Sequence, residues 1–584
     1  MERRKVGFVR NLWGGAVHLL ERKAFFKFAD ILALVVLGGV IYGVMSLARD
    51  ATGIMRPTVV IDLSPWALPK YTLLSLGRGI AAYMLSLAFT LVYGMWAAKD
   101  HTAGRVLIPI LDILQSIPVL GFMPGLIIGM VALFPHSNLG VELAAIIMIF
   151  TGQAWNMTFS FYHSVRTIPV ELQEVATVYR FSLFERFRWV ELPSTTMGLV
   201  WNSMVSMAGG WFFLMICESF VLGDRDYRLP GLGSYMSVAV AKGDTTAMVW
   251  AIIAMVIMII ALDQLFWRPV VVWAQVFRVE ETGQKEEMSS WFLDILRKSN
   301  IVEWVEGGIH RVMKFSLPKI KRPVEPTPVV KMVRGYMRFA PTLAFIILLF
   351  LLGWGAWKLA LFVTKVPLQD WTDIFLAAGL TLSRVMAAIA LGTLWALPCG
   401  IAIGISPKLS RMLQPIVQVA ASFPAPMLFP AAIAVMMALD IPLGWGSIFL
   451  MLLGTQWYIL FNIIAGAMAV PADLQEAARS YKLTTFQKYK KLYVPAAFPY
   501  LVTGWITAAG GAWNASIVAE YVTYKQKTVS AFGLGSQISI SAEHADFPRL
   551  AASVLVMSAI VVLLNRVLWQ NLFNFAKQRY SLNR

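Results

Sequence analysis

Two polar segments with the same order of chemical groups interrupt an otherwise apolar chain. They read IPVELQEVATVYRFSLFERFRWVELPS at 168–194 and VPADLQEAARSYKLTTFQKYKKLYVPA at 470–496. Each begins with a proline and then acids, which suits a helix start because proline needs no N–H there and acids favour the N-terminus. Glu174 and Glu476 therefore offer carboxylates, beside small side chains, to a basic partner. The pattern predicts a docking site that is present twice.

Each segment is expected to fold as a helix–turn–helix. A compact face is predicted for three side chains in each copy (Leu172, Val175, Ala176; Leu474, Ala477, Ala478). A second short helix is predicted at 184–190 and at 486–493, ended by Pro193 or Pro495. Two such surfaces in one chain indicate a partner with two-fold symmetry.

The elements that carry these segments are membrane spans. The chain has 584 residues, of which 58% are hydrophobic and 14% charged, and its mean hydropathy is +0.66. Since a helix needs roughly 20 apolar residues to cross a bilayer, about twelve spans fit. Their ranges are 31–48, 73–97, 106–133, 143–161, 197–220, 247–267, 341–363, 374–405, 412–439, 443–465, 500–521 and 550–569.

The net charge of +17 reflects topology and not nucleic-acid binding. Basic residues gather in segments that would lie on one side of the membrane, and the intervening loops hold few. This positive-inside pattern predicts that both termini are cytoplasmic. We expect a cytoplasmic amphipathic segment at 1–30, a cytoplasmic linker at 268–338 and a cytoplasmic tail at 570–584.

The chain is an internal duplication of two parallel six-helix halves. Arg78, Pro118 and Pro124 align with Arg384, Pro424 and Pro430 at one constant offset. At a second offset, Glu174, Pro193, Glu218 and 231–234 align with Glu476, Pro495, Glu520 and 533–536. The repeated domains are expected at 71–265 and 374–568, preceded by the spans at 31–48 and 341–363.

The repeated segments resemble the EAA loop of binding-protein-dependent ABC importer permeases, through Glu174-Val175-Ala176 and Glu476-Ala477-Ala478 with the later Leu-Pro or Val-Pro. The nitrate/sulfonate/taurine branch is the most similar. The resemblance implies an all-α polytopic membrane protein with the ABC type I importer permease fold, in a bacterial inner membrane. It also implies that these loops couple to an ABC ATPase dimer, and that an extracytoplasmic solute-binding protein delivers a small anion such as nitrate, a sulfonate or bicarbonate.

One position departs from the family pattern, which places glycine six residues after the motif glutamate. Arg180 and Lys482 stand there. Because left-handed geometry costs a non-glycine residue about 1 kcal/mol or more, the helix is expected to continue. Our hypothesis is that these bases contact acidic ATPase residues or anionic lipid.

Four ionisable residues within spans are candidates for the substrate pathway. Arg78 and Arg384 either guide an anion or extend to the outer interface. Glu218 and Glu520 either gate the pathway or pair with a helix, and the pairing is favoured. We expect no metal site, since the six histidines are scattered, and no ATP site, since no GxxxxGK[ST] loop occurs.

Three functions compete on this basis. An ABC importer permease with ATP bound to a separate subunit explains the paired loops. An ion-coupled secondary transporter also fits twelve spans in two parallel halves, but it predicts acid or histidine relays in mid-membrane. A membrane enzyme ranks last because no nucleophile, base and metal set is clustered.

Overall fold

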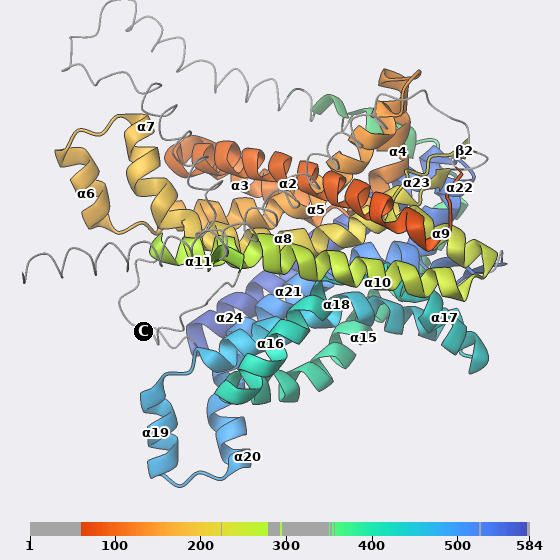
Figure 1. Ribbon diagram of the computed structural model, residues 1–584. Coiled ribbons are helices and arrows are strands. Elements are labelled where there is room, and N and C mark those ends of the chain that lie inside the picture. Colours follow the sequence, from red (N-terminus) through yellow and green to blue (C-terminus); the bar gives the residue numbers. More distant parts are fainter. Residues whose placement is uncertain are drawn as a thin grey trace, which may run out of the picture. The chain divides into compact units, whose positions relative to one another are not determined.

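The computed structural model describes residues 60–222, 225–277, 292–294, 350, 353–355, 357–524 and 527–580 (Figure 1). The predicted segment 1–30, the span 31–48, most of the linker and the first part of the span 341–363 lie outside the described residues. The chain divides into two compact units. The larger unit contains both repeats except residues 264–272, and it comprises residues 43–263, 273–283 and 366–584.

The first repeat is a set of helices joined by short turns. They are η1 (Pro65–Ala67), α2 (Leu68–Lys99), α3 (His101–Ser116), α4 (Val119–Leu133), α5 (Leu139–Arg166), α6 (Val170–Val178), α7 (Leu183–Arg186), η2 (Phe187–Glu191), α8 (Leu192–Glu218), α9 (Leu232–Lys242), α10 (Thr245–Leu262), η3 (Asp263–Trp267), α11 (Arg268–Ala274) and η4 (Gln275–Phe277). A two-stranded antiparallel hairpin, β1 (Val221–Leu222) and β2 (Arg225–Asp226), separates α8 from α9.

The second repeat follows the same order. It consists of α15 (Leu368–Ile405), α16 (Pro407–Ser422), η5 (Ala425–Met427), α17 (Phe429–Ala438), α18 (Leu443–Met468), α19 (Ala472–Ser480), α20 (Thr485–Lys488), η6 (Tyr489–Tyr493), α21 (Val494–Ala519), β3 (Tyr521–Tyr524), β4 (Lys527–Ser530), α22 (Leu534–Glu543), α23 (Phe547–Leu564), η7 (Asn565–Trp569) and α24 (Gln570–Tyr580). Its hairpin pairs Tyr521 with Ser530. The duplication predicted from sequence is therefore present in the order of the main helices and of the hairpin.

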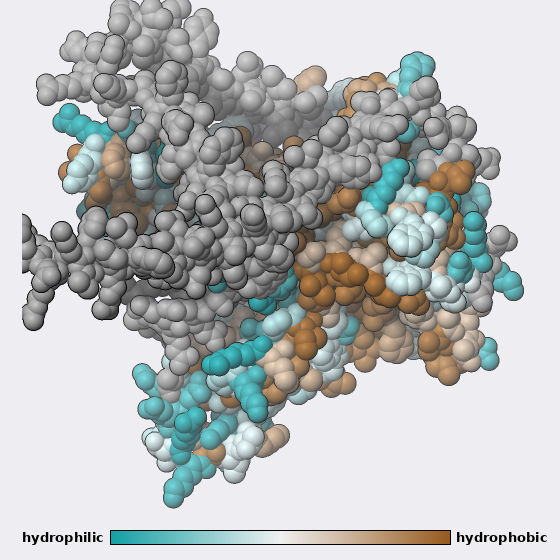
Figure 2. All heavy atoms as spheres, in the orientation of Figure 1, coloured by the Kyte–Doolittle hydropathy of each residue, from teal (hydrophilic) through white to brown (hydrophobic). Residues whose placement is uncertain are grey.

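Eight helices within the described residues are long and apolar enough to cross a membrane (65–99, 139–166, 183–218, 245–277, 368–405, 443–468, 485–519 and 547–580). This confirms an all-α polytopic membrane protein, apart from the two small hairpins. Figure 2 shows apolar residues over the helices around α10, whereas hydrophilic residues gather over α19 and α20.

The spans predicted at 106–133 and 412–439 are not straight helices, which corrects the sequence-based expectation. The chain bends by 95° between Thr102–Gln115 and Val119–Leu133. Proline disfavours helical geometry in the residue before it. Accordingly Ile117, before Pro118, and Phe423, before Pro424, are extended, with ψ of 123° and 128°. Both breaks fall at aligned prolines, so the duplication preserves them.

The two repeats contact each other at the break in the first repeat. Val119 is the first residue of α4, where helix N–H groups have no partner within the helix. Its N–H donates to Oδ1 of Asn514 in α21, at 2.8 Å. The second repeat thereby satisfies a backbone group that the break in the first repeat leaves free.

Two further hydrogen bonds between the repeats each join a side-chain amide to a carboxylate. Nδ2 of Asn565 donates to Oδ1 of Asp112 at 3.3 Å, and Nε2 of Gln418 donates to Oδ1 of Asp263 at 3.2 Å. Gln418 aligns with Asp112, and Asn565 aligns with Asp263. Each contact therefore joins one carboxylate to one amide, with both acids in the first repeat and both amides in the second.

This complementarity predicts that Gln418→Glu destabilises the protein. The introduced carboxylate would face Asp263 in a partly buried contact, and we expect the free energy of unfolding to fall by about 1–3 kcal/mol. Adding Asp263→Asn restores one carboxylate and one amide and should recover most of the loss. Thermal unfolding of the detergent-purified chain measures both effects. Gln414→Glu, one turn earlier on α16, is the control, and an equal loss there would contradict the interpretation.

Candidate functional site

The two polar segments fold as helical hairpins that project from one end of the helices (Figure 1). The expectation that the second helix ends at Pro193 or Pro495 is wrong, because it continues through η2 into α8 and through η6 into α21. Pro169 and Pro471 occupy the N-cap positions of α6 and α19. A capping box starts the second short helix of each, with Ser182 and Glu185 in α7 and Thr484 and Gln487 in α20. Because the N-cap proline and the capping box occur at equivalent positions in both copies, the two hairpins have the same local structure.

Each first helix presents its glutamate outward and its last alanine inward. Glu174 and Val175 are exposed, as are Glu476 and Ala477. Ala176 is buried against Ile168 and Val190, and Ala478 is also buried. The prediction that Val175 shares a face with Ala176 is therefore wrong, since Val175 is 45% exposed. The exposed glutamates are free to meet a partner surface.

Arg180 and Lys482 end these helices in left-handed geometry, with φ of 51° and 52°. The expectation that the helix continues is wrong. The N–H of Phe181 donates to the carbonyl of Ala176 at 2.9 Å, and the N–H of Arg180 to that of Thr177 at 3.1 Å. These are the two bonds of a Schellman motif, and Phe181 packs against the buried cluster that contains Ala176. The turn is thus formed without glycine.

A glutamine that the sequence analysis did not single out closes each hairpin. Nε2 of Gln173 donates to the carbonyl of Ile168 at 3.0 Å, and Gln475 makes the same bond to Val470 at 3.1 Å. Its recurrence in both Leu-Gln-Glu triplets was the available signal. These residues hold the helix start against the preceding chain.

The first hairpin is also tied to the end of α2 by charge. The buried carboxylate of Glu191 lies 2.9 Å from Nζ of Lys99 and 3.1 Å from Nε of Arg186. In the second repeat Tyr493 aligns with Glu191. Within the described residues, the first hairpin therefore has an ionic link to the membrane helices that the second lacks.

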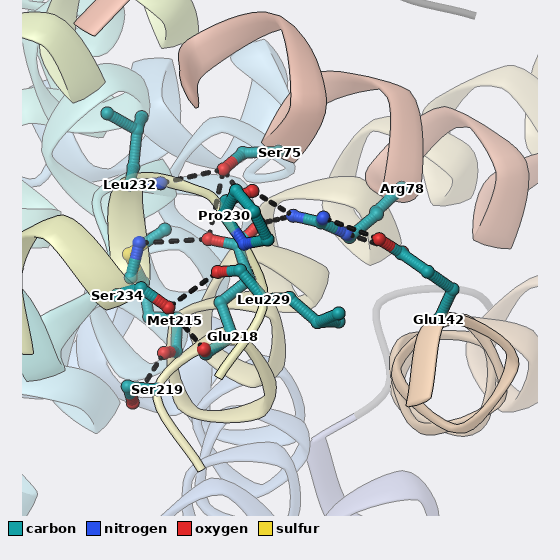
Figure 3. Close-up of polar contacts among 11 residues, drawn as sticks. Ser75, Arg78, Glu142, Met215, Glu218, Ser219, Leu229, Pro230, Leu232 and Ser234 are labelled. Atoms are coloured by element: carbon teal, nitrogen blue, oxygen red, sulfur yellow. Dashed lines mark hydrogen bonds and ion pairs between the residues drawn. The ribbon is translucent and has the colours of Figure 1, made fainter. Parts of the chain in front are cut away.

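At the other end of the helices, Arg78 is buried between two carboxylates (Figure 3). Its Nε and Nη2 donate to the two oxygens of Glu142, both at 2.7 Å, and its Nη1 donates to Oε1 of Glu218 at 2.7 Å. Arg78 has no exposed surface, so it does not extend to an interface. Glu142 was not predicted, and a lone acid in an apolar run was its only signal.

Glu218 also holds the start of α9. Its Oε2 accepts the N–H of Gly233 at 2.9 Å, and Ser75 donates to its Oε1 at 2.7 Å. A Cβ on Gly231 would lie 2.3 Å from the carboxylate, so only glycine fits there. The Gly-Leu-Gly segment is thus shaped around the buried glutamate.

The second repeat builds the same arrangement with one acid fewer. Nη1 of Arg384 donates to Oε1 of Glu520 at 2.7 Å, while Thr381 and the N–H of Gly535 also donate to Glu520. A Cβ on Gly533 would lie 2.4 Å from that carboxylate. The four residues predicted for a substrate pathway are therefore brought together as two ion pairs.

A separate cavity of about 160 Å³ lies between the repeats. Asn156 and Phe212 line it from the first repeat, and Tyr458, Thr507 and Asn514 from the second. None of the lining residues is charged, and neither ion pair is among them. The assignment of the ion pairs to the substrate pathway stays a prediction.

This fold and these paired hairpins define a polytopic membrane transport component made of two fused copies. The family described as "Binding-protein-dependent transport system inner membrane component" matches residues 90–266 and 388–569, more than half of the chain. The chain therefore belongs to this family of ABC transporter permeases.

Similar proteins include permeases named for small solutes that carry a compact oxyanion group. The nitrate import permease protein NrtB of Leptolyngbya laminosa is 29% identical over 26% of this chain and 52% of its own length. The bicarbonate transport system permease protein CmpB of Synechococcus elongatus is 27% identical over 32% and 65%. The taurine transport system permease protein TauC of Escherichia coli is 28% identical over 32% and 64%. The chain spans about half to two thirds of the length of these relatives.

We predict that Glu218→Gln destabilises the protein strongly. Removing one charge from a buried ion pair costs about 3–5 kcal/mol, and the amide would also face donors from Ser75 and Gly233. Thermal unfolding in detergent measures the loss. Glu171→Gln on the exposed face of α6 is the matched control, and equal stability of the two variants would contradict a structural role for Glu218.

Proposed function

We propose that this chain is the permease of an ATP-driven importer that moves a small anionic solute across a bacterial inner membrane. The observation that carries the proposal is the pair of exposed helices, α6 and α19, with Glu174 and Glu476 at matching positions of two repeats. A two-fold ATPase dimer would place one subunit under each helix. ATP binds to that partner and not to this chain.

The domain and membrane arrangement is part of the proposal. Residues 71–265 and 374–568 form the two permease domains, 268–338 joins them in the cytoplasm, and both termini are cytoplasmic. An extracytoplasmic binding protein delivers the solute at the end opposite to the hairpins. The cavity between the repeats, with its uncharged lining of polar and apolar side chains, supports a path at their interface.

The solute class rests on chemistry shared by the relatives' printed names. Nitrate, bicarbonate and the sulfonate of taurine each carry a compact oxyanion. The neutral donors around the cavity suit an anion that must be released again, since they bind it without a full opposite charge. Family membership counts against the ion-coupled secondary transporter.

We predict that an ABC ATPase subunit copurifies with the wild-type chain in mild detergent and is lost from Glu174→Arg/Glu476→Arg. Charge reversal would place two cations where a basic partner surface is expected to dock. Glu543→Arg, an exposed acid on α22, is the control. If no ATPase appears even after crosslinking, and the chain alone moves solute with an ion gradient, the proposal is wrong.

The hypothesis for Arg180 and Lys482 has its own test. Glycine at both positions suits the left-handed turn and removes about 1 kcal/mol of strain each, so the hairpins should fold. We expect weaker assembly with the ATPase or with anionic lipid because the charge is lost. Arg180→Lys/Lys482→Arg keeps the charge and serves as control. Intact assembly and transport in the glycine variant would refute the hypothesis.

A further inference from the structure

The two buried arginines differ in what occupies one edge of the guanidinium. In the first repeat, Nε and Nη2 of Arg78 form a fork that holds both oxygens of Glu142, each at 2.7 Å. The third nitrogen, Nη1, binds Glu218 and the carbonyl of Pro230 (Figure 3). Every side of this guanidinium is therefore taken by the protein.

In the second repeat the same edge has no protein acid beside it within the described residues. Glu142 lies in the first turn of α5, and the position that aligns with it in α18 is Gly444. A Cβ built on Gly444 would have Nη2 of Arg384, at 3.6 Å, as its one neighbour within 4 Å. Gly444 thus lies beside Nη2 of Arg384, and it has no side chain to hold the fork as Glu142 does in the other repeat.

The remaining contacts of Arg384 leave this fork accessible. Within the described part of the chain, Glu520 is the acid paired with Arg384, through Nη1. The side chain of Arg384 is 12% exposed, whereas that of Arg78 is fully buried. The first repeat neutralises one cation with two carboxylates, and the second supplies one.

We propose that the Nε–Nη2 fork of Arg384 beside Gly444 binds a planar oxyanion, so that the solute takes the place of the missing carboxylate. A guanidinium fork matches the two oxygens of a carboxylate-like group and forms two charge-assisted bonds with it. Nitrate and bicarbonate have the same planar arrangement of oxygens as the Glu142 carboxylate. The site rests on the proposed function and assigns this bidentate contact to the second repeat alone, because the fork of Arg78 is already filled.

The experiment measures anion binding by the thermal unfolding of the full chain in phosphatidylcholine nanodiscs. Sodium nitrate and sodium bicarbonate are titrated at constant ionic strength against sodium chloride. We expect the wild-type unfolding temperature to rise with nitrate or bicarbonate. Gly444→Glu rebuilds the internal carboxylate, so it should unfold at a higher temperature without anion and weaken anion binding by at least about tenfold.

Two further variants keep the test decisive. Gly444→Ala leaves the fork open, since a Cβ has only one neighbour there, and should retain the anion response. Arg384→Lys keeps the charge beside Glu520 but lacks the fork, so it should lose the preference for nitrate or bicarbonate over chloride. An unchanged response in Gly444→Glu or Arg384→Lys, or no response in the wild type, overturns the inference.

The outcomes also separate this site from its alternatives. Stabilisation by phosphatidylglycerol in the nanodisc, without any by nitrate or bicarbonate, would assign the fork to a lipid phosphate and overturn the solute site. ATPase capture without an anion response would leave the proposed function standing and this site refuted. An anion response in a chain that captures no ATPase would support the site while the proposed function fails.

Discussion

A guanidinium buried in an apolar bundle has to be neutralised where it sits, because each unpaired buried ion costs several kcal/mol. Both repeats meet this requirement with a glutamate at the end of a long helix, Glu218 on α8 and Glu520 at the end of α21. Each carboxylate then fixes its surroundings. It accepts a backbone N–H from the next helix, and it leaves room only for glycine at Gly231 or Gly533.

The same helices connect the ion pairs to the two exposed helical hairpins. From Leu183 to Glu218 the chain is a continuous helical span of 36 residues, with the π-helical turn η2 near its beginning. At 1.5 Å per residue its length is about 54 Å. The α7 end of the hairpin and the buried carboxylate of Glu218 therefore lie at opposite ends of one continuous helix. Glu191 strengthens this helix, since it joins the hairpin to the end of α2 through Lys99.

The features predicted correctly from the sequence are those that follow from its internal repeat and from local hydrophobic patterns. The duplication follows from the two similar halves of the sequence. Eight straight spans and the proline-started hairpins follow from residues near each other in the chain. The break before Pro118 was missed because the flanking residues are apolar on both sides, although the proline was visible. The left-handed turn at Arg180 was missed for a different reason. Two backbone bonds and the packing of Phe181 offset its strain, and propensity alone does not include them.

Contacts between distant elements were the part that the sequence did not predict, and they are where the two repeats have diverged. The acid at Asp112 corresponds to an amide at Gln418, while Asp263 corresponds to Asn565, so the exchange keeps one carboxylate in each contact. At Glu142 and Gly444 no exchange compensates, since the acid is absent and nothing in the described residues takes its place. A substitution that preserves the pairing is explained by assembly of the two repeats. One that leaves the Nε–Nη2 edge of Arg384 without a carboxylate needs a different explanation, and the proposed oxyanion would supply the two missing oxygens.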